Sequence, residues 1–179
     1  MRRSRRQLIK TKANELLRRS SIFEAPVDVE RVARDLNILV RRTPSDDDIS
    51  GFLLRNSGGQ AIIGVNTLHH PNRQRFTIAH EIGHCVLNHQ SELHIDRAVV
   101  KLRDHASNKG EDPDEVEANG FAAELLMPAE FLSDDLRKLT LTDLLDDRKM
   151  QQIAKKYQVS VQAMTNRLVS LGYLPELTR

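Results

Sequence analysis

The feature of this chain that most constrains its fold is a pair of histidines inside a segment with helical periodicity. Pro71 can begin a helix, and apolar residues then recur at helical spacing as far as Val86. His80 and His84 are four positions apart, so their imidazoles lie on nearly the same face of that helix. Two imidazoles on one face can bind a single cation. The pattern therefore predicts a metal site built on one helical turn.

Glu81 lies beside this pair, rotated by about 100° around the helix from His80. Its carboxylate would lie next to the cation, where it can act as a general base toward metal-bound water. Gly83 costs the helix about 1 kcal/mol relative to alanine, which indicates a close approach by backbone or substrate. A chance occurrence of this spacing has a frequency on the order of a few in a hundred. We therefore predict Glu81 as a catalytic residue.

A catalytic zinc usually has three protein ligands, so one more is expected from another segment. Glu115 opens a second helical segment and shares a face with Asn119. We predict Glu115 as the third ligand and Asn119 as a hydrogen-bond partner of a site side chain. Glu117 is the second choice of ligand, although we favour a solvated carboxylate for it. The predicted cofactor is Zn²⁺, with Mn²⁺ as the alternative for such a ligand set.

Smaller roles are predicted for the other histidines and for the single cysteine. We expect His89, His94 and His105 to be surface groups, with hydrogen bonding to the transition state as the alternative. Cys85 is rotated by about 100° from His84, so a buried thiol is favoured over a ligand. One cysteine forms no internal disulfide and suits a reducing compartment, so a cytoplasmic location is expected.

The composition, with 39% hydrophobic and 29% charged residues, is typical of a globular protein. No stretch reaches transmembrane length, and no apolar run of signal-peptide type follows the basic N-terminus, so no membrane partner is expected. The net charge is +2, and a basic cluster lies within the first 19 residues. We interpret this cluster as a solvated helix face.

The periodicities predict an α+β fold, mostly helical, with a small antiparallel three-stranded sheet. The strands are expected at residues 38–42, 49–55 and 60–65, with a hairpin turn at 57–59. The helices around them are expected at residues 7–19, 29–36, 71–89 and 113–127. Two C-terminal segments, 149–157 and 161–171, have the pattern of a helix-turn-helix.

Two longer motifs carry a resemblance to a known family. The first is RFTIAHEIGH at residues 75–84, and the second is EVEANGFAAELLMP at residues 115–128. Both resemble the ImmA/IrrE family of metallopeptidases, and the resemblance covers residues 7–128. It implies a zincin-like fold with zinc on His80, His84 and Glu115 and with Glu81 as the catalytic base. The spacing of four between Glu115 and Asn119 is similar to that in related glutamate zincins, which favours Glu115 over Glu117.

The predicted organisation is a zincin-like metallopeptidase domain at residues 1–145 and a helix-turn-helix-like extension at residues 146–179, packed on the same unit. Members of the family cut or inactivate helix-turn-helix repressors, and some act beside toxin–antitoxin modules. The resemblance therefore implies a zinc-dependent endopeptidase. Its expected substrate is a regulatory protein, a helix-turn-helix repressor or antitoxin-like partner, in stress-response or mobile-element regulation.

The alternative is a non-catalytic, metal-containing module that binds a repressor or DNA through its C-terminal helices. Glu81 favours the enzyme, because a structural zinc site has no need of a base. Direct nucleic-acid binding is not expected, since the segment at residues 161–171 offers only Arg167 to read bases.

Overall fold

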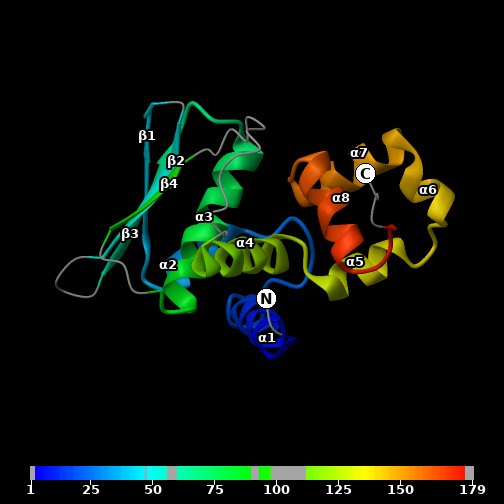
Figure 1. Cartoon of the computed structure of the whole chain (residues 1–179), viewed down its shortest axis with the longest axis horizontal. Coiled ribbons are helices and arrows are strands. Elements are labelled where there is room, and N and C mark those ends of the chain that lie inside the picture. Colours follow the sequence, from blue (N-terminus) through cyan, green and yellow to red (C-terminus); the bar gives the residue numbers. More distant parts are fainter. Residues whose placement is uncertain (1–2, 47, 56–59, 90–92, 98–111, 176–179) are drawn as a thin grey trace.

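The structure is a computed structural model that describes residues 3–46, 48–55, 60–89, 93–97 and 112–175. The α+β fold is mostly helical, as predicted, and the sheet lies at the opposite end from α5–α8, with α3 and α4 between them (Figure 1). The elements are α1 (Arg3–Arg19), α2 (Val29–Asp35), β1 (Leu39–Thr43), β2 (Ile49–Arg55), β3 (Ala61–Asn66), α3 (Pro71–Val86), β4 (Leu93–Arg97), α4 (Pro113–Leu126), α5 (Ala129–Leu136), α6 (Leu141–Leu145), α7 (Asp147–Tyr157) and α8 (Val161–Ser170). None of the helices in these ranges is long and apolar enough to cross a membrane.

The sheet has four strands in the order β1-β3-β2-β4, and it is mixed. The prediction of three antiparallel strands was wrong in number and in direction. β2 pairs antiparallel with both β3 and β4, whereas β1 pairs parallel with β3. The burial of the strands agrees with this order. The last four residues of β3 are buried, as expected of a central strand, whereas the last three residues of β1 are exposed, as expected of an edge strand. The predicted hairpin turn at residues 57–59 lies outside the described residues.

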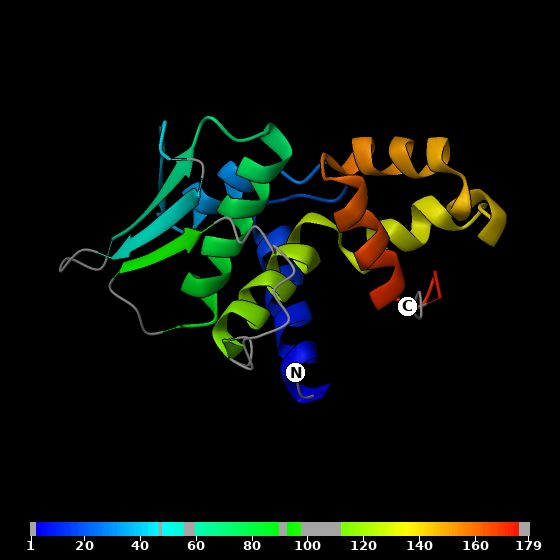
Figure 2. The same ribbon diagram turned by 45° about the horizontal axis from the view of Figure 1, so that its top comes forward.

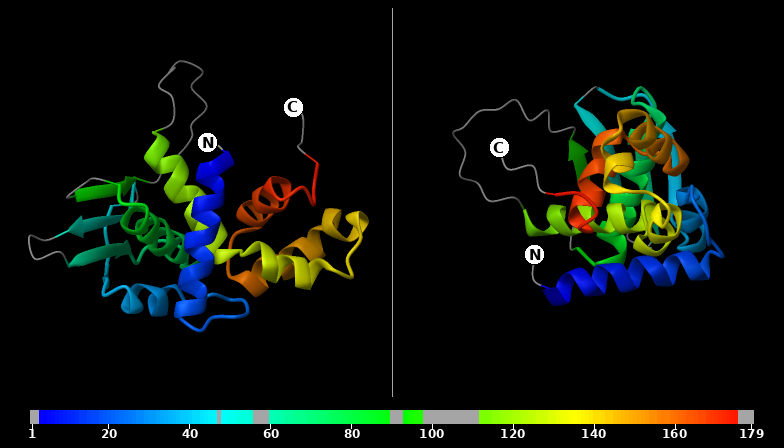
Figure 3. Two further views of the ribbon diagram at one scale, coloured as in Figure 1. Left: turned by 90° about the horizontal axis from the view of Figure 1, so that it is seen from below. Right: turned by 90° about the vertical axis from the view of Figure 1, so that its right-hand side faces the viewer.

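The helices α3 and α4 pack closely at Gly83. A Cβ atom at Gly83 would lie 3.1 Å from Cδ1 of Phe121 and 3.2 Å from Cα of Ala118. Glycine therefore lets the two backbones approach, which explains its presence in a helix where alanine would be favoured. The helix α1 runs along the other side of α4 (Figure 3). As a result, α4 is held between α1 and α3.

The four C-terminal helices lie beyond α4 on the side away from the sheet (Figure 2), and polar contacts join α8 and the turn before it to the central helices. Arg167 of α8 is 6% exposed and donates to both carboxylate oxygens of Glu124 in α4, at 2.9 and 2.6 Å. Its Nε also donates to the carbonyl of Met127 at 3.0 Å. Asn72 of α3 donates to the carbonyl of Val159 at 2.9 Å. The division into two domains at residue 145 stays a prediction.

The Gly83 contact gives a first prediction. In Gly83→Val, the added methyl groups should force α3 and α4 apart, and overpacking of this kind typically lowers the free energy of unfolding by about 1–3 kcal/mol. Urea denaturation of the two proteins measures this change. The control is Gln152→Val at an exposed position of α7, which carries only the helix-propensity cost of valine, below about 0.7 kcal/mol. Equal losses in the two variants would show that the α3–α4 contact is not tight.

Candidate metal centre

The predicted metal-binding segment forms a well-capped helix whose central turns are buried. Nδ1 of His70 accepts from the backbone N–H of Asn72 at 3.1 Å, and Pro71 occupies the first turn. The side chains of His80, Glu81 and His84 are buried, with 2%, 0% and 3% of each residue exposed. Buried polar groups of this kind need partners. The prediction that both histidines share one helix face is confirmed.

The helix α4 brings a carboxylate to this face. Nε2 of His80 and Nε2 of His84 are 3.0 Å apart. Glu115 lies in the first turn of α4, which Asp112 caps, and its Oε1 is 3.2 Å from Nε2 of His84. Its Oε2 is 3.5 Å from Nε2 of His80. The structure therefore brings His80, His84 and Glu115 together around one point.

His94 also lies in this cluster, so the prediction of a surface group was wrong. It projects from β4, and its Nε2 is 2.7 Å from Oε1 of Glu115. Its Nδ1 is 3.2 Å from Oε2 of Glu81. One potential ligand atom from each of His80, His84, His94 and Glu115 lies within 4.8 Å of the others. The signal in the sequence was the apolar-polar alternation of residues 93–96, which predicts a strand with histidine on one face.

His89 is likewise not a surface group, because it is 6% exposed. Its Nδ1 is 2.9 Å from Nδ1 of His84, and its Nε2 is 3.3 Å from Oε2 of Glu117. The prediction of a surface position was therefore wrong for His89 too. The third histidine of that group, His105, lies outside the described residues.

Glu117 and Asn119 take different places along α4. Glu117 is directed away from the cluster and pairs with Arg5 of α1, with Nε to Oε1 at 2.7 Å. Because only 13% of its side chain is exposed, the expectation of a solvated carboxylate was wrong. Asn119 Oδ1 is 3.1 Å from Nδ1 of His80. The predicted contact between Asn119 and a site histidine is confirmed.

Charges in the cluster shift one another's proton affinities. Hydrogen bonds from His80, His84 and His94 hold the pKa of Glu115 far below its usual range. Hydrogen bonds to Glu115 and then to Glu81 raise the pKa of His94 to about 10. Burial lowers the pKa of His84, and the same effect at His80 is outweighed by nearby carboxylates, so the pKa of His80 is raised. The carboxylates therefore make this a cation-attracting centre.

One buried oxygen of the centre lacks a protein partner. Oε1 of Glu81 has no hydrogen bond among the described residues, whereas its Oε2 faces His94. An unpartnered buried carboxylate oxygen is costly unless water, a metal or a substrate group binds there. Two imidazole nitrogens and a carboxylate are also the ligand types of catalytic zinc sites. The residues present therefore fit a metal ion with an adjacent base.

Cys85 takes no part in the cluster. The residue is partly exposed rather than fully buried as predicted, and burial raises the pKa of its thiol.

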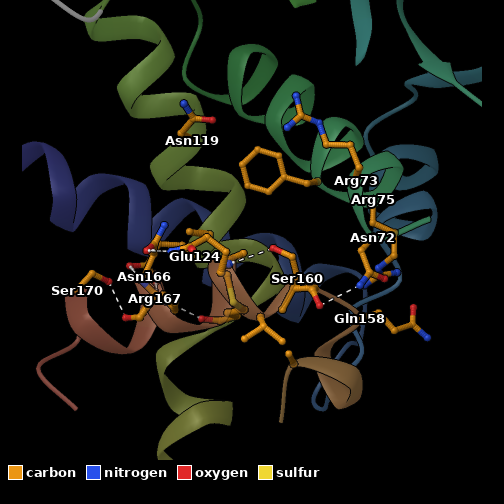
Figure 4. A pocket seen from close by; sticks show the side chains of 18 of the residues that line it. Asn72, Arg73, Arg75, Asn119, Glu124, Gln158, Ser160, Asn166, Arg167 and Ser170 are labelled. Carbon is orange, nitrogen blue, oxygen red and sulfur yellow. Dashed lines mark hydrogen bonds and ion pairs between the residues drawn. The ribbon is translucent and has the colours of Figure 1, made fainter. Parts of the chain in front are cut away.

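A large cleft lies between the central helices and the C-terminal helices (Figure 4). Its volume is about 1530 Å³, and its walls come from α1, α3, α4, α7 and α8. Asn119 lines this cleft and its Oδ1 contacts Nδ1 of His80, although His80, His84 and Glu115 do not themselves line the cleft. The volume exceeds the roughly 300–1,000 Å³ of pockets for small ligands. The cleft has room for a segment of polypeptide.

The sequence matches known proteins along the same region. The IrrE N-terminal-like domain (Peptidase_M78) matches residues 33–169. The radiation response metalloprotease IrrE of Deinococcus deserti is 36% identical over 100 residues, which is 55% of this chain and 32% of the relative. The protein of the same name from Deinococcus radiodurans is 33% identical over 102 residues, which is 55% of this chain and 28% of the relative. The chain thus spans about a third of these relatives. Since the match covers most of its length, the chain belongs to the IrrE N-terminal-like domain family.

Proposed function

We propose that this chain is a zinc-dependent endopeptidase. His80, His84 and Glu115 are the metal ligands, and Glu81 is the catalytic base. The observation that carries the proposal is the convergence of Nε2 of His80, Nε2 of His84 and the Glu115 carboxylate beside the fully buried Glu81. Three protein ligands leave one position for water or substrate in a tetrahedral site. The same arrangement supports a zincin-like peptidase unit.

Zinc is favoured over manganese because two imidazoles and one carboxylate are a common set for catalytic zinc, although Mn²⁺ accepts the same donors. A zinc ion bound here would lower the pKa of its water to about 7 and polarise a substrate carbonyl. Glu81 would accept a proton from the attacking water at Oε1, the oxygen that has no hydrogen bond among the described residues. His94 holds the other oxygen, Oε2, and so fixes the orientation of the carboxylate. The proton can then pass from Glu81 to the leaving amine.

The proposed substrate is an extended segment of a regulatory protein, a helix-turn-helix repressor or an antitoxin-like partner. The cleft beside Asn119 supports a polypeptide, because its volume is larger than small-ligand pockets require. A role in stress response is supported by the relatives, whose name describes them as radiation response metalloproteases. The proposal places the reaction in the cytoplasm, where a single cysteine stays reduced.

The competing function is a non-catalytic module that binds a repressor or DNA through its C-terminal helices. The DNA form is disfavoured by Arg167, whose guanidinium is held by Glu124 and the carbonyl of Met127 and is therefore not free to reach base edges. A non-catalytic module that only binds a repressor would not need a fully buried glutamate beside two histidines.

The ligand assignment predicts the metal content of three variants. Wild type and Glu130→Gln should each hold one zinc per chain after gel filtration, because Glu130 is exposed in the first turn of α5. Glu115→Gln should lose the metal, since it removes a ligand. Glu117→Gln should keep its zinc, because Glu117 contacts Arg5 and His89 rather than the proposed ligands. Inductively coupled plasma mass spectrometry gives the stoichiometry. An empty Glu117→Gln protein beside a loaded Glu115→Gln protein would reverse the assignment.

The base assignment predicts that Glu81→Gln separates binding from hydrolysis. This variant should keep one zinc and lose peptide-bond cleavage by about 10²–10⁴-fold, the usual contribution of a general base. The assay incubates zinc-loaded protein with purified helix-turn-helix repressors encoded beside its gene and detects new N-termini by mass spectrometry. Glu130→Gln serves again as the control. Repressor release from operator DNA that survives in zinc-loaded Glu81→Gln would exclude hydrolysis as the mechanism.

A further inference from the structure

The end of α3 folds back in a way that presses His89 against His84. Asn88 has a left-handed φ of 59°, the conformation that ends a helix in a Schellman motif. The N–H of His89 donates to the carbonyl of His84 at 3.1 Å, and the N–H of Asn88 donates to that of Cys85 at 3.3 Å. These are the two hydrogen bonds of that motif, which brings the residue after the left-handed position over the last helical turn. His89 is therefore placed by backbone geometry.

Arg55 of β2 fixes this turn from outside. Its Nη1 donates to the carbonyl of His89 at 2.6 Å, and its Nη2 donates to the carbonyl of His84 at 2.9 Å. One guanidinium thus holds both residues of the contact. The two imidazole rings have centroids 4.9 Å apart and meet edge to face.

Metal binding through Nε2 of His84 determines which atoms donate in the hydrogen bonds that link His84, His89 and Glu117. Nε2 of His84 faces Nε2 of His80 and Oε1 of Glu115, so a ligating His84 carries its proton on Nδ1. That proton points to Nδ1 of His89 at 2.9 Å, which must accept it. His89 then carries its own proton on Nε2, which faces Oε2 of Glu117 at 3.3 Å. Metal binding at His84 therefore determines the tautomers of both His84 and His89.

Glu117 completes the chain because it is held as a carboxylate. The Arg5 guanidinium makes two contacts with it, Nε to Oε1 at 2.7 Å and Nη2 to Oε2 at 2.6 Å. The charged acceptor strengthens the bond from His89 and, through it, the basicity of the ligand. By contrast, His80 has a simple acceptor, Asn119.

We propose that His89, Glu117 and Arg5 are positioning residues that fix the tautomer and orientation of His84 for metal binding. They connect the last turn of α3 through α4 to α1, so the N-terminal helix takes part in forming the centre. This inference rests on the proposed function, because it assigns the outer partners of a proposed ligand.

The test is the Zn²⁺ dissociation constant at pH 7.5, measured by competition with a chromogenic chelator. His89→Leu should raise the Kd by about 10–100-fold, the usual loss for an outer partner of a ligand. His89→Asn should recover part of this loss, because its Oδ1 can accept from His84 where Nδ1 did. Arg5→Gln should raise the Kd by no more than about fivefold, because the pair with Glu117 is partly exposed. The matched control is Arg18→Gln, an exposed position at the other end of α1, which should leave the Kd unchanged.

A spectroscopic measurement tests the tautomers directly. Long-range ¹H–¹⁵N spectra of zinc-loaded wild type should show His89 protonated at Nε2 only. A His89 proton on Nδ1, or a Kd for folded His89→Leu within twofold of the wild type, overturns the proposal. Thermal melting of each metal-free variant shows which proteins are folded, and His89→Asn replaces His89→Leu if the latter is unfolded. If wild type binds no zinc, the proposed function fails and this inference fails with it, whereas a zinc-loaded wild type with the His89 proton on Nδ1 overturns this inference alone.

Discussion

The close packing of α3 on α4 is the constraint on which the candidate centre depends. The two histidines lie on α3, but the carboxylate that meets them comes from α4, more than thirty positions later in the chain. Gly83 and Ala118 leave so little side chain between the helices that their backbones can approach. The helix α1 then covers the opposite side of α4 and provides Arg5. Three helices from distant parts of the sequence are thus fixed around one buried turn.

This packing brings carboxylates and imidazoles together at a point where a cation would be stabilised. The carboxylates of Glu81 and Glu115 lie among three imidazoles. Glu81 is fully buried, and one of its oxygens has no partner in the described parts of the chain. Hydrogen bonds between carboxylate and imidazole favour the charged form of each, which explains why the pKa of Glu115 is lowered and that of His94 is raised. Such perturbed groups gather at functional sites because chemistry there requires them.

Local sequence signals predicted six of the helices, α1 to α4, α7 and α8, and the His80–Glu81–His84 arrangement, because both follow from a period of 3.6 residues. They did not locate α5 and α6. The arrangement of the strands could not be obtained in this way. The sequence contains no pairing information that places β3 between β1 and β2 or that brings β4 to the other edge of β2. The buried roles of His89 and His94 were missed for the same reason, since each depends on a turn or a strand pairing. Glu117 looked solvated because its partner, Arg5, lies 112 residues earlier.

The central claim is that one metal ion binds to His80, His84 and Glu115. A crystal structure of the zinc-loaded protein, with anomalous data collected on both sides of the zinc absorption edge, tests it most directly. We expect a single strong anomalous peak about 2.0–2.2 Å from Nε2 of both histidines and from a carboxylate oxygen of Glu115. A peak coordinated by Glu117 instead, or the absence of a peak between α3 and α4 in protein crystallised with zinc, would contradict the account.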